Sequence, residues 1–187
     1  EIPLVGVLTG SIVSVILPDL SRYLKEGACD RALRLWQNAS VRCSALLLPA
    51  MVLLYILAPE IMTILLSPRY EDSALPFRIL LLLLPIRTVG FGALYVAGNR
   101  GRLVLLKTAA SLLVTLALTV PFVRVLGAWG GAAATVVAVY GFIVPLNCWL
   151  LAGVVRTRPS AVLPTRRLVE TLVAAMLPGA VAATILE

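Results

Sequence analysis

Long apolar runs are the feature that most constrains the fold of this chain. Six segments are almost wholly apolar: 2–18, 41–58, 74–98, 103–122, 129–155 and 168–186. Each approaches or exceeds the roughly 20 residues that a helix needs to cross the hydrocarbon core of a bilayer. A lone strand in lipid would leave its backbone N–H and C=O groups unpaired, so each run is expected to be helical. The sequence therefore predicts an all-α integral membrane protein with six transmembrane helices.

Composition excludes several other classes of protein. Sixty per cent of the 187 residues are hydrophobic and 13% are charged, too few for the surface of a water-soluble domain, so the net charge of +7 does not indicate nucleic-acid binding. Histidine is absent, and Cys29, Cys43 and Cys148 have no paired spacing, so we expect no metal site, no cofactor and no disulfide framework. Without a histidine general base we also expect no catalytic residues, and hence no enzyme.

The positions of the basic residues predict the orientation of the spans. Most of the sixteen Lys and Arg residues fall in three alternate connecting segments, at 22–42, 100–107 and 156–167. The positive-inside rule places these segments in the cytoplasm. The loops near 60–72 and 124 then lie on the outer side.

Two regions are expected along the chain. Residues 1–155 would form a bundle of five spans, with an amphipathic interfacial helix near 30–40 that carries Arg31 and Arg34. This helix is either a plain juxtamembrane helix or a binder of anionic lipid headgroups. Residues 156–187 would form a basic cytoplasmic linker and one additional transmembrane helix. The chain opens at Glu1 without Met and closes after an apolar run, so we expect a fragment of a longer protein.

Arg87 is the first candidate for substrate binding. It lies near the middle of the third apolar run, where a charge is costly unless it faces a polar cavity or a partner. In a cavity it would bind an anion such as phosphate; otherwise it pairs with a carboxylate in the part of the protein outside this fragment, or snorkels. Arg78 is a second candidate, for which snorkelling to the outer interface is the favoured alternative. Pro85 between them is expected to bend the helix.

A polar stripe marks the fourth run. Lys107, Ser111, Thr115 and Thr119 recur every four residues and so share one helix face. The stripe either lines a water-filled cavity or forms a contact between helices. Asn147 in the fifth run is a further cavity candidate.

Small residues spaced four apart predict close helix packing. Gly6 and Gly10 form one such pair in the first run, and Gly127 and Gly131 form another around the start of the fifth. A role in gating is the alternative. Acidic residues, by contrast, lie at the ends of runs or in loops, so recognition by cations and an anionic, phosphate-bearing cargo are favoured.

The order of these features resembles a known family. The chain carries LPDLS at 17–21, LLSPRY at 65–70, AGNR at 97–100 and, most specifically, LGAWGGAAAT at 126–135. Together they are similar to the C-terminal half of the polysaccharide flippases of the MOP exporter superfamily, which include O-antigen and lipid II flippases. Ser67 departs from the family pattern, which usually has Gly there.

The resemblance implies a multi-pass transporter in the bacterial inner membrane, with two six-helix bundles around a central cavity and twelve or fourteen helices in total. Its substrate would be an undecaprenyl-pyrophosphate-linked saccharide, moved across the membrane by alternating access. The partners would be membrane lipids and the N-terminal half of the same protein, with no nucleic acid. Arg87 and the Lys107 stripe would fall in helices that line the cavity.

Two rival functions stay open at this stage. A MATE-like multidrug or cation antiporter of the same superfamily would carry an intramembrane carboxylate in the remaining half. A membrane-embedded glycan polymerase or ligase would need a substantial outer loop with catalytic groups, whereas the outer loops here are short.

Overall fold

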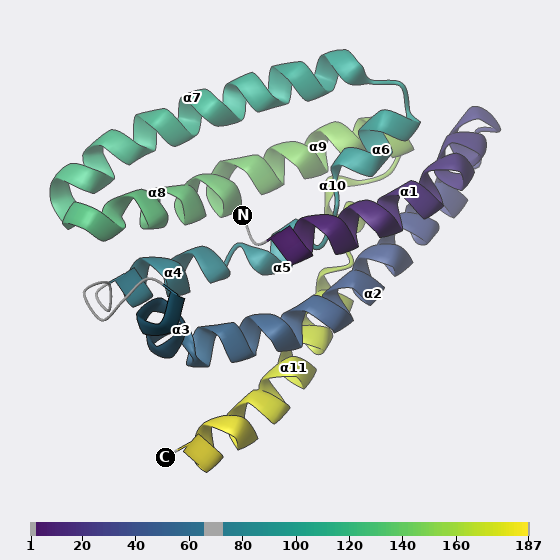
Figure 1. Ribbon diagram of the computed structural model, residues 1–187. Helices are drawn as coiled ribbons and strands as arrows, with labels where there is room; N and C mark the ends of the chain where they lie inside the picture. Colours follow the sequence, from purple (N-terminus) through teal and green to yellow (C-terminus); the bar gives the residue numbers. More distant parts are fainter. Residues whose placement is uncertain (1–2, 66–72, 187) are drawn as a thin grey trace.

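The computed structural model describes residues 3–65 and 73–186, and every regular element within them is helical (Figure 1). The helices are α1 (Pro3–Lys25), α2 (Cys29–Ile56), α3 (Ala58–Leu65), α4 (Ala74–Leu81), α5 (Leu84–Arg87), α6 (Gly92–Ala97), α7 (Gly101–Leu126), α8 (Gly130–Ala138), α9 (Val144–Val155), α10 (Pro159–Val162) and α11 (Thr165–Leu186). A 3-10 turn, η2 (Gly127–Trp129), precedes α8, and a π-helical segment, η3 (Val139–Ile143), joins α8 to α9.

The all-helical prediction is confirmed for these residues, but six spans are not. Among the residues that the structure describes, four helices are long and apolar enough to cross a membrane: α1 from Gly6, α2, α7 and the continuous helix Gly130–Val155. A fifth span results if α4 is counted with Leu84–Ala97, although the two parts are bent by 41°. The run 168–186, predicted as the sixth span, lies in one continuous helix, α11.

The N-terminal part of α2 contains the segment expected to lie at the interface. α2 runs without interruption from Cys29 to Ile56, so the segment near 30–40 and the run 41–58 form one helix. Twenty-eight residues at 1.5 Å per residue give about 42 Å, longer than the ~30 Å hydrocarbon core. One end of α2 therefore projects beyond the core if the helix crosses it.

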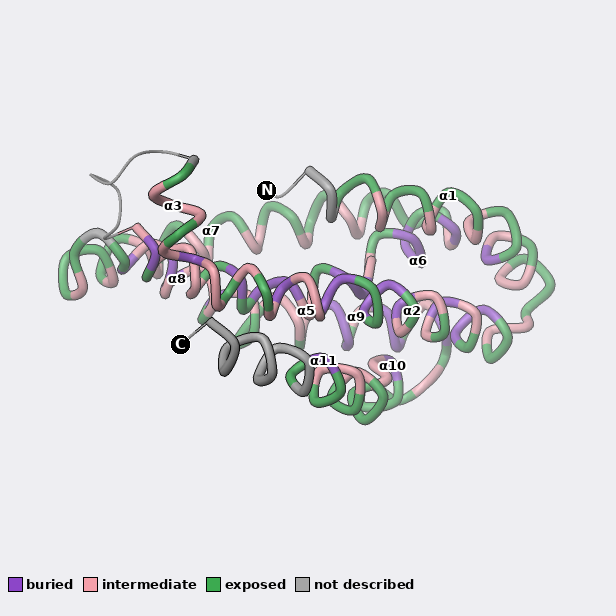
Figure 2. Tube along the Cα trace, turned by 60° about the horizontal axis from the view of Figure 1, so that its bottom comes forward, coloured by how far each residue is buried: buried purple, intermediate pink, exposed green. Residues whose placement is uncertain are grey.

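The main core lies where α1, α2, α6, α9 and α10 meet. Trp36, Leu94, Tyr95, Leu151 and Val162 are all at most 1% exposed there. Figure 2 shows the buried colour along α2 and α9, whereas α7 is coloured as exposed or intermediate throughout. α7 is joined to α8 by a short turn and lies beside it (Figure 1).

The third apolar run is broken rather than continuous. α4 ends at Leu81 and α5 begins at Leu84 with a proline in its first turn, so the bend expected from Pro85 is present. Pro85 lacks an N–H and suits the start of a helix, which places the break just before it. A break inside a membrane leaves backbone groups that other parts of the protein must satisfy.

Side chains of α2 form hydrogen bonds with the segment that follows α5, including two of its backbone carbonyl groups. The Trp36 indole Nε1 donates to Gly90 O at 3.3 Å, and the Ser40 hydroxyl donates to Val89 O at 2.9 Å. One turn further on, the hydroxyls of Ser44 and Thr88 are 2.6 Å apart. Trp36, Ser40 and Ser44 are four residues apart, so one face of α2 makes all three contacts.

A tyrosine of the π-helical segment donates a hydrogen bond to the backbone at the break between α4 and α5. The Tyr140 hydroxyl donates to Leu82 O at 2.6 Å. The segment η3 ends two residues before Pro145, which has no N–H to donate to residue 141, so the backbone winds there with a wider turn. The two irregular points of the fold are thus joined by one hydrogen bond.

Glycine is required at two positions of the α7–α8 turn. Gly127 has φ +66°, a conformation that L side chains rarely adopt. A Cβ on Gly130 would overlap the carbonyl of Phe122 and would lie 2.9 Å from Val123 Cα. At Gly131 the nearest atom, Val123 Cγ2, is 4.0 Å away. The close contact predicted for Gly131 is therefore made by its neighbour, Gly130.

Candidate functional site

Lys107 is the centre of the candidate site. It lies in α7 about 9 Å along the helix axis from Gly101, and its side chain is half-buried. Lys107 Nζ donates to Asn147 Oδ1 of α9 at 3.0 Å. The same ammonium lies 4.5 Å from the ring centroid of Tyr95 in α6, a cation–π contact. Three helices thus converge on one cation.

Asn147 and Tyr95 form the buried wall of this site. Asn147 is 2% exposed and Tyr95 is fully buried. The Tyr95 hydroxyl donates to Asn147 Oδ1 at 3.2 Å, and Asn147 Nδ2 donates to Ile143 O, the last residue of η3, at 2.7 Å. Both ends of the Asn147 amide are therefore held, and its oxygen is presented to the ammonium.

All partners of Lys107 in this group are neutral. Within 3–65 and 73–186, Lys107 forms no ion pair with a carboxylate. An amide oxygen and an aromatic ring orient a lysine but do not neutralise its charge, and a half-buried cation in an apolar span favours an anion nearby. The site, which we call the Lys107 cluster (Lys107, Asn147 and Tyr95), can therefore bind an anionic group.

Sequence reasoning selected two of these three residues. Lys107 and Asn147 were separate candidates, and the structure brings them together across 40 positions. Tyr95 was missed because a tyrosine among Leu, Val and Ala looks like a packing residue. Its hydroxyl was the available signal, since a buried tyrosine hydroxyl needs a hydrogen-bond partner.

Two other hydroxyls of the polar stripe on α7 donate to the backbone of their own helix. The Ser111 hydroxyl donates to Lys107 O and the Thr119 hydroxyl donates to Thr115 O, each at 2.7 Å. All four stripe residues are half-buried, between exposed leucines. Beyond Lys107 the stripe therefore faces neighbouring helices without donating to them.

Arg87 lies on the outside of the described chain. It is the last residue of α5, and its side chain is exposed. The structure places Arg87 and the Lys107 cluster on different helices. Arg87 can therefore line a cavity only if another part of the protein, or another molecule, forms the opposite wall.

Arg78 has a structural role in this fold. Its Nε donates to Tyr55 O at 3.0 Å, and its guanidinium lies 5.5 Å from the Tyr55 ring centroid. Tyr55 is in the last turn of α2, where carbonyls lack partners within the helix. Arg78 thus closes the end of α2.

Gly6 and Gly10 have open space beside them. Both are exposed on α1, and a Cβ at either position would meet no atom within 4 Å. The close packing predicted there is not formed within the part of the chain that the structure describes.

No cluster of three or more His, Cys, Asp or Glu side chains that could hold a metal ion occurs among the described residues. Comparison with models of known protein families, with curated proteins and with solved structures gives no match for this chain.

Proposed function

We propose that this chain is part of a membrane flippase that moves a lipid-linked, pyrophosphate-bearing saccharide across the bacterial inner membrane by alternating access. The observation that carries the proposal is the Lys107 cluster. An ammonium held by a neutral amide and an aromatic ring, inside an apolar helix, is suited to a phosphate group.

The irregular helices support a transport mechanism. Alternating access requires segments that bend between two arrangements, and discontinuous helices are common at the binding sites of transporters. The break before Pro85 and the π-helical segment supply two such points, and Tyr140 joins them. Asn147 donates to the end of that segment, so bending there would move the Lys107 cluster.

The exposed Arg87 supports a cavity shared with a second bundle. Arg87 is exposed, and a guanidinium offers paired N–H donors that suit phosphate oxygens. In a two-bundle transporter of the kind that the sequence resembles, the exposed face of α5 would lie against the other half. Arg87 would then be a second phosphate contact.

The sign of the charge disfavours the antiporter rival. An antiporter for organic cations needs an anionic or aromatic site, whereas Lys107 would repel such a substrate. The flippase is therefore the better reading of this site.

Replacing Lys107 by Gln in the full-length protein should lower transport by about tenfold or more, because a charge-assisted hydrogen bond to phosphate contributes about 1.5–3 kcal/mol. The measurement is the amount of lipid-linked precursor that reaches the outer leaflet in a flippase-deficient bacterial strain. Lys107→Arg, which keeps the charge, should retain most of the activity.

The matched control is Lys25→Gln, which removes a lysine of the same charge from the exposed end of α1. It should leave transport unchanged, and immunoblots should show equal insertion of all variants. Wild-type transport by Lys107→Gln would exclude Lys107 as the binding residue. Arg87→Ala tests the second contact in the same assay.

A further inference from the structure

A cavity of about 410 Å³ lies between α2 and the segment that leads into α11. The polar residues that line it are Arg34, Gln37, Asn38, Thr165, Arg166 and Arg167. It is separate from the Lys107 cluster, with which it shares no lining residue. Its lining therefore brings together arginines from two of the basic segments, 22–42 and 156–167.

The walls of this cavity are fixed by contacts to the core. Gln37 Nε2 donates to Ala161 O and to Val162 O, both at 2.9 Å, which ties α10 to α2. Val162 is fully buried, and Leu168 packs against the same core. The cavity is thus built by anchored segments and not by a loose surface loop.

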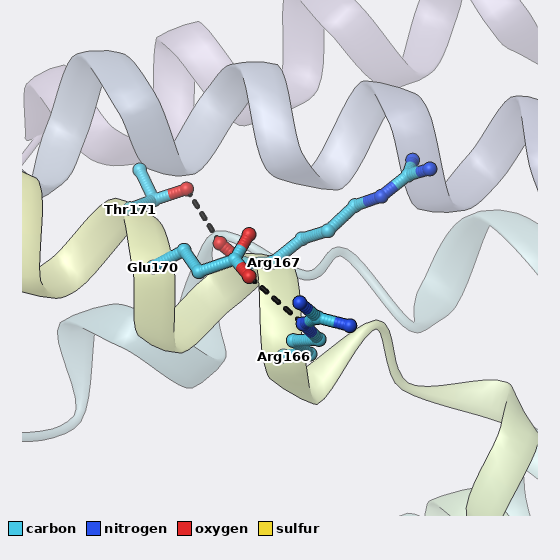
Figure 3. Close-up of polar contacts among 4 residues, drawn as sticks. All are labelled: Arg166, Arg167, Glu170 and Thr171. Carbon is cyan, nitrogen blue, oxygen red and sulfur yellow. Dashed lines mark hydrogen bonds and ion pairs between the residues drawn. The ribbon is translucent and has the colours of Figure 1, made fainter.

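The three arginines have different partners. Arg167 Nη1 donates to Asn38 Oδ1 of α2 at 3.0 Å, and Arg166 Nε pairs with Glu170 at 2.9 Å. Figure 3 shows Arg167 extended away from the Arg166–Glu170 pair. Arg34 forms no hydrogen bond or ion pair with the residues that the structure describes. Of these three guanidinium groups only that of Arg166 is paired with a carboxylate, so the cavity keeps a net positive charge.

The cavity lies beside the starts of two apolar runs. Arg34 is seven residues, or about 10 Å, before the run 41–58, and Arg167 directly precedes the run 168–186. Lipid phosphates lie at this boundary between the hydrocarbon core and water. The arrangement is therefore where a headgroup would meet the protein.

A neighbouring apolar cavity points to a lipid and away from a soluble phosphate. It measures about 430 Å³, lies between α1 and α2, and is lined mainly by apolar side chains that include Ile12, Val15 and Ile16. Asn38 lines both cavities. A molecule with a phosphate at one end and an acyl chain at the other matches the two.

We propose that the cavity formed by Arg34, Asn38, Arg166 and Arg167 binds the phosphate headgroup of an anionic bilayer phospholipid. Guanidinium groups offer paired N–H donors to phosphate oxygens and keep their charge at all physiological pH values. A net positive site also favours a headgroup with net negative charge over a zwitterionic one. This inference does not depend on the transport proposal.

The test is retention of phospholipid by the purified protein, measured by native mass spectrometry after mixing with phosphatidylglycerol or phosphatidylcholine. We expect phosphatidylglycerol to be retained at least tenfold more than phosphatidylcholine. The double variant Arg34→Gln/Arg167→Gln should retain about tenfold less phosphatidylglycerol than the wild type. The matched control, Arg100→Gln/Arg102→Gln, removes two exposed arginines from another basic segment and should lose none.

The single variant Arg34→Gln separates loss of binding from misfolding, because Arg34 forms no hydrogen bond or ion pair with the described residues. This variant should retain about threefold less phosphatidylglycerol than the wild type. Equal retention by wild type and the double variant would overturn the proposal, as would equal retention of the two lipids. Displacement of phosphatidylglycerol by millimolar inorganic phosphate would assign the cavity to a soluble anion and would overturn the lipid assignment.

Discussion

α2 and α7 are both long enough to cross a membrane, and the more apolar of the two is the less buried. α7 is the more apolar of the two, yet none of its apolar window is buried, whereas a third of the α2 window is buried. α2 carries Trp36, Ser40 and Ser44 on its buried face. α7 presents leucines such as Leu112 and Leu113 outward, at 68% and 67% exposure.

The difference shows what determines burial in a chain of this kind. Lipid is as apolar as leucine, so a leucine gains little by turning inward. Polar side chains and broken backbone have no partners in lipid and must find them inside the protein. The inner face of α2 is therefore the one with hydroxyl and indole donors, and the outer face of α7 is the one with leucines.

The largest effect is expected at Trp36 of α2, and a Trp36→Ala variant as stable as the wild type would contradict this explanation of burial. Trp36→Ala removes a side chain that is 1% exposed, its hydrogen bond to Gly90 O and its contact with the Phe91 ring. We expect a loss of about 3 kcal/mol in the free energy of unfolding. The measurement is an SDS titration in mixed micelles. Leu113→Ala on α7 is the control and should cost less than about 0.5 kcal/mol.

Gly130 tests the close approach of α8 to the last turns of α7. Gly130→Ala would push a methyl group into the Phe122 carbonyl, so we expect a loss of about 2 kcal/mol in the same titration. The methyl of Gly131→Ala meets only Val123 Cγ2 at 4.0 Å and should be nearly neutral. Similar losses for the two variants would mean that α7 and α8 do not approach as described.

The smallest expected effect concerns the hydroxyl pair between α2 and the segment after α5. A double-mutant cycle with Ser44→Ala and Thr88→Ala should give a coupling free energy of about 1 kcal/mol, as is typical of hydrogen bonds between membrane helices. Ser111→Ala on α7, which removes a bond within one helix, should cost less than about 0.5 kcal/mol. A coupling free energy near zero would show that the contact between the Ser44 and Thr88 hydroxyls does not help to hold α2 inside the protein.

The sequence sufficed to predict the helices and part of the candidate site. Apolar runs indicate helices because backbone satisfaction in lipid leaves no other form, and most run boundaries lie near helix ends. Lys107 and Asn147 were identifiable because polar residues in apolar runs are costly. The contact between Lys107 and Asn147 could not be predicted, because it depends on how α7 and α9 pack.

The break in the third run could be predicted only in part. Pro85 indicates a bend, but the hydrogen-bond partners of the residues around it come from α2 and from η3, 44 and 58 residues away. The four-residue spacing of Trp36, Ser40 and Ser44 was a readable signal that one face of α2 donates hydrogen bonds. Gly130 could not be told from Gly131 by composition, since only the Phe122 carbonyl distinguishes them.

The amide of Asn147 sets a limit on what the Lys107 cluster can hold at one time. A carbonyl oxygen has two lone pairs, and those of Asn147 are occupied by the Lys107 ammonium and the Tyr95 hydroxyl. A water molecule or a small cation can therefore not bind this oxygen unless one donor leaves. An arriving anion that draws the Lys107 ammonium away would leave one lone pair of the Asn147 oxygen without a donor. A water molecule could then bind there, so hydration of the Asn147 amide would indicate that an anion is bound.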